Sequence, residues 1–174
     1  MSSHGVNVSC LNGEAATIIN VEKEMFSCNS IHLACHGVQD AKDPLKSSFC
    51  LGDGHLELSE IIKKQIPQGD LAFLYACQTS KGNSELTEEA MHFAAGMLSM
   101  GYWSVVATMW AIQDEHGPVM AEEFYKHMLE NGNGKIDGRK AAYALHHTTQ
   151  HLQKKLDNTK DALLAWLPYV HYGV

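Results

Sequence analysis

The stretch LAFLYAC, residues 71–77, decides the fold. It is the longest apolar strand candidate in the chain, and it is apolar on both faces. Continuous runs of this kind are typical of central parallel strands that helices cover on both sides. The stretch therefore predicts the central strand of an α/β sheet.

The segments on either side of this run alternate between strand and helix patterns. The expected elements are, in order, a strand at 6–10, a helix at 14–26, a buried strand at 31–35, a hairpin at 49–58, a short helix capped by Ser59, the central strand, a helix opened by Thr87, a strand at 104–110, a helix from Pro118, a helix capped by Asp137 and a short helix near Leu163. Alternation of this kind predicts an α/β fold: a mostly parallel sheet with helices on both faces.

Length and composition favour one globular domain that spans residues 1–174. The chain carries 13 Lys and Arg against 20 Asp and Glu, a net charge of −7. This acidic balance, without a basic run, disfavours nucleic acid and anionic membrane as partners. No apolar stretch approaches the roughly 18 residues of a membrane helix, and the N-terminus lacks the features of a secretory signal.

The five cysteines are odd in number and form no C-x-x-C pair. This pattern disfavours a disulfide framework and the common zinc spacings. Reduced cysteines are typical of a cytoplasmic protein, which is the location we expect.

Two chemically active residues stand where neighbouring strands should end. His36 and Gly37 follow the strand at 31–35, and Cys77 ends the central strand. Sites in open α/β sheets form beyond the carboxyl ends of the strands, so His36 and Cys77 should lie close together. A thiolate is a nucleophile, and an imidazole can protonate a departing amine. Gly37 leaves room for a substrate carbonyl, and backbone N–H groups after Cys77 could hold an oxyanion.

Each residue alone also has a structural reading. A cysteine that ends an apolar strand is commonly inert core, and a histidine there is commonly a hydrogen-bonded residue. Their conjunction, with the histidine first, approaches the caspase layout, in which the histidine lies roughly 50 residues before a Q-A-C-x-G motif.

Other candidate sites are weaker, and we predict no metal and no cofactor. On a strand, His32 and His36 share one face while Cys35 points to the other, so the three do not form a metal cluster. His147 and His151 have the i, i+4 spacing of metal ligands on a helix. However, no carboxylate or third histidine stands out beside them in the sequence, which favours a solvated face.

Several segments in the same order resemble the CHAT domain. They are residues 31–37 (IHLACHG), 71–79 (LAFLYACQT), 94–97 (AAGM), 106–110 (VATMW) and 166–171 (WLPYVH). The resemblance covers nearly the whole chain from about Val8. CHAT domains are caspase-like cysteine peptidases, related to separase, metacaspases and gingipains. The resemblance implies that His36 is the catalytic histidine, that Cys77 is the nucleophile, and that the backbone amides of Gly37 and Cys77 hold the oxyanion.

We therefore predict an intracellular cysteine endopeptidase that acts on a protein or peptide. The alternative is a caspase-fold scaffold that binds partners without cutting them. A small-molecule acyltransferase is a third interpretation, but nothing in the sequence supplies its cofactor pocket. Family members usually carry another strand, and often repeats, before the point where this chain starts. We expect the isolated chain to be weakly active until a repeat domain or partner orders its loops.

The expected substrate specificity is basic. Asp114 follows the strand after the nucleophile strand, near where separase-like relatives place a pocket acid. A carboxylate there favours Arg or Lys before the scissile bond. Asp114 could instead cap the helix near Pro118, and Asp53 on the hairpin is the second candidate for the pocket acid.

Overall fold

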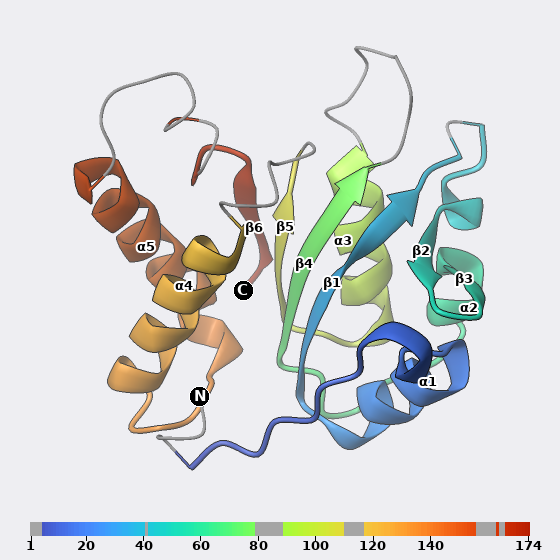
Figure 1. The fold of residues 1–174 in the computed structure, drawn as a ribbon, viewed down its shortest axis with the longest axis horizontal. Coiled ribbons are helices and arrows are strands. Elements are labelled where there is room, and N and C mark those ends of the chain that lie inside the picture. Colours follow the sequence, from blue (N-terminus) through green and yellow to red (C-terminus); the bar gives the residue numbers. More distant parts are fainter. Residues whose placement is uncertain (1–4, 41, 79–88, 110–116, 156–162, 164–165) are drawn as a thin grey trace.

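The computed structural model describes residues 5–40, 42–78, 89–109, 117–155, 163 and 166–174, with backbone alone for 76–78, 89 and 90. The described strands form one six-stranded sheet in the order β3-β2-β1-β4-β5-β6 (Figure 1). The strands are β1 (Ser30–Val38), β2 (Ser48–Leu51), β3 (Gly54–Glu57), β4 (Leu71–Gln78), β5 (Ser104–Thr108) and β6 (Tyr169–Gly173). The helices are α1 (Ile18–Ser27), α2 (Leu58–Ile61), α3 (Glu89–Met100), α4 (Gly117–Asn131) and α5 (Ala141–Lys155).

The sheet is parallel at its centre and antiparallel at its sides. β4 lies between β1 and β5 and pairs in parallel with both. The β2–β3 hairpin joins β1 antiparallel, and β6 joins β5 antiparallel. The α/β class is confirmed. The mostly parallel arrangement holds for the three central strands, and β6 is a strand that the sequence pattern did not predict.

Helices cover the two faces of the sheet unequally. Against one face, α1, α2 and α3 pack on residues of β1 to β5, including Leu33, Leu74 and Val105. Against the other face, α4 and α5 pack on Phe73 of β4, Val106 of β5 and Tyr169 of β6. Within the part of the chain that the structure describes, no β1 residue belongs to this second core cluster. Helices lie on both faces, but the second layer is displaced towards the β6 side (Figure 1).

β1 is half exposed, which corrects the prediction of a buried strand at 31–35. His32, Ala34 and His36 are exposed on the face that α4 and α5 cover only in part, whereas Leu33 is buried on the opposite face. His32 and His36 alternate with apolar residues in the sequence, as expected of a strand with one exposed face. Because Ala34 is also apolar, the run at 31–35 resembles a strand that is buried on both faces.

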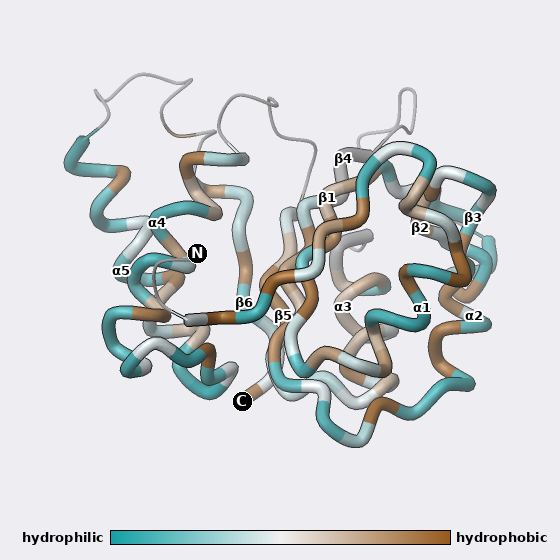
Figure 2. Tube along the Cα trace, turned by 60° about the horizontal axis from the view of Figure 1, so that its bottom comes forward, coloured by the Kyte–Doolittle hydropathy of each residue, from teal (hydrophilic) through white to brown (hydrophobic). Residues whose placement is uncertain are grey.

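The strand predicted at residues 6–10 is also wrong, because residues 6–12 form no regular structure. Figure 2 shows this trace alternating between hydrophobic and hydrophilic residues outside the sheet. Val8 remains 58% exposed. An alternating pattern stabilises a strand only where a neighbouring strand pairs with it, and no pairing of these residues exists in the described sheet.

Caps explain where two of the helices begin. The Thr17 side chain accepts a hydrogen bond from the Asn20 amide and starts α1. Asp137 accepts from the Arg139 amide ahead of α5, as predicted. The predicted cap at Ser59 is wrong, because α2 begins at Leu58 with Glu57 at its N-cap position.

Candidate active site

The register of β1 against β4 places His36 directly opposite Cys77 in the sheet. Their Cα atoms are partners in the parallel ladder that runs from Ser30 and Leu71 to Gly37 and Gln78. Neighbouring strands lie about 4.8 Å apart in the hydrogen-bonding direction. Two positions that are distant in the sequence are therefore adjacent at the carboxyl edge of the sheet, as the strand pattern predicted.

The two positions also share one face of the sheet. Side chains alternate along a strand, and Phe73 of β4 packs on the α4 side, so positions 75 and 77 belong to the same face. On β1, the His32 ring lies 4.8 Å from the Phe73 ring, which places positions 32 and 36 on that face too. His36 is exposed there. The backbone thus presents both positions to the side that the second helix layer leaves open at β1.

The histidine and the cysteine nearest to His36 on β1 are poor alternatives for the chemistry. The His32 ring lies against Phe73 and Tyr125, and this desolvation lowers the pKa of His32 to about 4. Cys35 packs against the opposite core, and burial, followed by the charge of Cys50, raises its pKa to about 12. At neutral pH His32 therefore stays uncharged and Cys35 stays a thiol. The expectation that His32 and Cys35 point to opposite faces is confirmed.

A second cysteine–histidine pair lies on the β2–β3 hairpin, and sequence reasoning missed it. Cys50 and His55 are register partners, and their Sγ and Nδ1 atoms are 3.6 Å apart. Ser48 Oγ lies 3.4 Å from the same nitrogen. Desolvation raises the pKa of Cys50, which disfavours its thiolate. The turn at residues 52–55 (GDGH) indicates the hairpin and also fixes which residues of its two strands oppose each other. The sequence could therefore have shown this pair.

The residues predicted around the dyad are placed as follows. Gly37 is buried and lies opposite Phe49 of β2. Asp53 Oδ1 accepts a hydrogen bond of 2.8 Å from the Ile18 amide at the start of α1, which gives this carboxylate a structural role. Asp114 lies outside the described residues.

The start of α4 reaches the end of β4 through Gly117 and Tyr75. A Cβ atom at Gly117 would lie 2.5 Å from carbon atoms of the Tyr75 ring, so the backbone of α4 sits directly on that ring. Tyr75 is two residues before Cys77, and Gly117 is three residues after Asp114. Neither residue stood out in the sequence, because only the three-dimensional structure shows the close approach.

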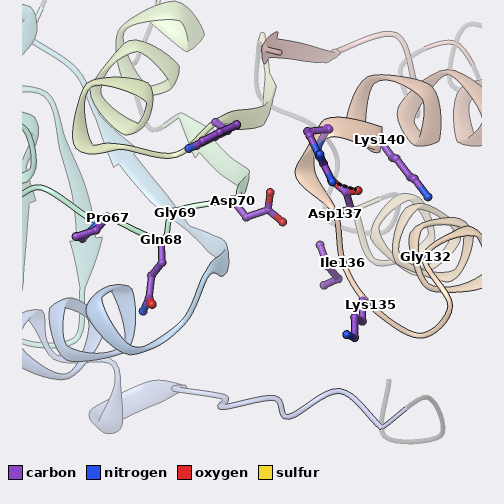
Figure 3. A pocket seen from close by; sticks show the side chains of 11 residues that line it. Pro67, Gln68, Gly69, Asp70, Gly132, Lys135, Ile136, Asp137 and Lys140 are labelled. Atoms are coloured by element: carbon purple, nitrogen blue, oxygen red, sulfur yellow. Dashed lines mark hydrogen bonds and ion pairs between the residues drawn. The ribbon is translucent and has the colours of Figure 1, made fainter.

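A separate hollow of about 530 Å³ lies at the opposite edge of the sheet (Figure 3). Its lining comes from the segment before β4, from Trp103 before β5 and from the α4–α5 connection. Asp70 accepts hydrogen bonds from the Gly138 amide there, and Arg139 pairs with Asp137. Since it faces the amino ends of β4 and β5, it is distinct from the His36–Cys77 edge.

Two further properties of the described residues concern metals and membranes. The described residues include no group of three or more His, Cys, Asp or Glu side chains that is arranged to hold a metal ion. None of their helices is both long enough and apolar enough to span a bilayer.

Comparisons with known proteins agree with the fold and the motifs. No curated protein matches the chain. The model of the CHAT domain family matches residues 3–174, which is nearly the full length. The six-stranded sheet is consistent with the caspase-like α/β architecture of this family. The chain belongs to the CHAT domain family.

Proposed function

We propose that this protein is a cysteine endopeptidase in which His36 and Cys77 form the catalytic dyad. One observation supports this most directly: the two residues are register partners at the carboxyl edge of the central parallel strands. Membership of the CHAT family, a caspase-like family, supports the same class of chemistry.

The proposed reaction has two steps. The Cys77 thiolate attacks the peptide carbonyl carbon and forms an S–C bond, and the oxyanion is held by backbone amides at this edge, for which the sequence predicts Gly37 and Cys77. The C–N bond then breaks as His36 gives a proton to the departing amine. In the second step His36 takes a proton from water, the resulting hydroxide attacks the thioester carbon, and the S–C bond breaks to release the acid and regenerate the Cys77 thiolate.

Two of the described thiols are poor nucleophiles in their environments. Desolvation raises the pKa values of Cys35 and Cys50, so neither forms a thiolate readily at neutral pH. His36 is exposed, so a peptide bond can approach it from solvent.

Mutation of the dyad tests this function. Cleavage of a proteome-derived peptide library is measured for the wild type, Cys77→Ala and His36→Ala, with folding checked by circular dichroism. We expect each variant to lose at least about 1,000-fold in rate, since removal of a nucleophile or its base costs more than this in related dyads and triads.

The Cys50–His55 pair supplies the matched control. Cys50→Ala and His55→Ala remove a thiol and an imidazole from another pair of register partners in the same sheet, and we expect cleavage within about twofold of the wild type. Cleavage that persists in Cys77→Ala would contradict the proposal. A folded wild-type chain that cleaves no peptide in the library would favour the scaffold interpretation.

A further inference from the structure

The α4–α5 hairpin brings together two histidines that are far apart in the sequence. The rings of His127 on α4 and His147 on α5 are stacked, with their centroids 4.0 Å apart. One turn away, Glu123 of α4 faces His151 of α5, and Oε2 and Nε2 are 3.8 Å apart. The fold thus adds a third histidine and a carboxylate to the i, i+4 pair His147 and His151.

The stacked imidazoles gain little from their protein surroundings. Asn131 Nδ2 lies 3.4 Å from both ring nitrogens of His127, which is long for a hydrogen bond, and it donates at 2.9 Å to the His127 carbonyl instead. Among the described residues, no hydrogen bond to a His147 ring nitrogen is found. A ligand would therefore compete with only a long contact at His127.

Both rings can also be reached from solvent. His147 is exposed and His127 is half-buried. Neutral imidazole is the form that ligates metal ions.

We propose that His127 and His147 bind a divalent transition-metal ion of the zinc class, which then bridges α4 and α5. Two nitrogens at about 2.05 Å from a tetrahedral Zn²⁺ lie about 3.3 Å apart, so both rings must turn out of their stacked arrangement, with centroids 4.0 Å apart, to bind one ion. Water completes the coordination. Imidazole ligands on a surface favour Zn²⁺, Cu²⁺ or Ni²⁺ over Mg²⁺ or Ca²⁺.

Calorimetric titration with ZnCl₂ tests the site. We expect one equivalent of Zn²⁺ to bind the wild type and to bind at least about tenfold more weakly to His127→Gln and to His147→Gln, because even the loss of an outer-shell partner costs roughly 10–100-fold. His146→Gln is the matched control, since it removes an exposed imidazole from the next position of α5. Cys77→Ala distinguishes Zn²⁺ binding at the two histidines from Zn²⁺ binding at the Cys77 thiol.

Thermal unfolding gives a second readout that depends on the bridge itself. A metal that binds only the folded helix pair raises Tm, so Zn²⁺ should raise Tm in the wild type and in His146→Gln but not in His127→Gln or His147→Gln. Equal Zn²⁺ affinity in the wild type and both site variants would overturn the proposal. No binding to the wild type at millimolar Zn²⁺ would also overturn it.

Discussion

At the scale of single residues, contact with two aromatic rings sets the charge of His32 on β1. The His32 ring lies tilted against the rings of Phe73 and Tyr125, and desolvation lowers its pKa from 6.5 to about 4. The unfolded chain therefore binds more protons than the folded chain between these values. Stability therefore falls as the pH falls from 6.5 towards 4. We expect His32→Phe to lose less stability over this range than the wild type, as measured by urea midpoints at pH 7 and pH 4.5.

A control histidine separates this effect from general acid unfolding. His146 is exposed on α5, and His146→Gln should keep the pH dependence of the wild type. A His32→Phe variant with unchanged pH dependence would contradict the account of the desolvated ring.

Specificity is the second residue-scale prediction. We propose Asp114 as the pocket acid because Gly117, three residues later, lies on Tyr75, two residues before the nucleophile position. We expect peptides with Arg or Lys at P1 to be cleaved fastest, and Asp114→Ala to reduce that preference at least about tenfold, the order of a lost charged contact. A P1-scanned peptide library measures this. Preference for Asp at P1, or an unchanged basic preference in Asp114→Ala, would contradict it.

Asp53→Ala is the comparison variant for that library. Its carboxylate caps α1 through the Ile18 amide, so we expect a loss of stability of about 1 kcal/mol with little change in P1 preference. A larger effect of Asp53→Ala than of Asp114→Ala on basic peptides would reverse the two assignments.

At the scale of elements, β1 has an edge that is paired over a small part of its length. In the described sheet β1 pairs with β4 from Ser30 to Gly37, but it pairs with β2 at Gly37 and Val38 alone. Alternate amides between Ser30 and His36 should therefore exchange with solvent much faster than those directed to β4. Hydrogen exchange followed by NMR measures this. Uniform protection along β1 would show that another segment covers the edge.

The contact between α4 and β4 gives a second element-scale prediction. A methyl group at Gly117 would overlap the Tyr75 ring, so Gly117→Ala should cost about 1–3 kcal/mol of unfolding free energy. Gly54→Ala is the matched control, because its nearest neighbour is the flexible end of Ile18 at 3.3 Å. Denaturant unfolding compares the two variants. Equal stability of Gly117→Ala and the wild type would contradict the close packing of α4 on Tyr75.

Elements that carry their own signals were predictable from sequence. The apolar run of β4, the GDGH turn of the hairpin and the Asp137 cap each have a local physical cause, and all three are present. The failures depend on neighbours instead. Residues 6–10 alternate like a strand but pair with none in the described sheet, and β6 forms because β5 offers it an edge. The exposure of β1 depends on how far α4 and α5 extend.

The candidate site follows the same division. The positions of His36 and Cys77 were predictable, because strand order and the carboxyl-edge rule bring them together without knowledge of any side-chain packing. The Cys50–His55 pair follows from the hairpin register that the turn at residues 52–55 sets, so the sequence could have shown it. The His127–His147 stack and the contact of Gly117 with Tyr75 depend on helix docking, which one sequence without its tertiary contacts does not specify.

At the scale of the whole molecule, the chain is acidic, and its second helix layer leaves β1 partly uncovered near the proposed dyad. The net charge of −7 favours the approach of basic peptides, and the exposed face of β1 leads to the proposed dyad. The central claim is that one cysteine of the five is an activated nucleophile and that His36 makes it so.

Covalent labelling with an electrophilic peptidyl ketone that carries Arg at P1 tests this claim most directly. The labelled protein is digested, and the modified cysteine is identified by mass spectrometry in the wild type and in His36→Ala. The account predicts fast modification of Cys77, little modification of Cys10, Cys28, Cys35 and Cys50, and slow modification of Cys77 in His36→Ala. Uniform slow labelling of all five cysteines, or a Cys77 rate that His36→Ala leaves unchanged, would contradict it.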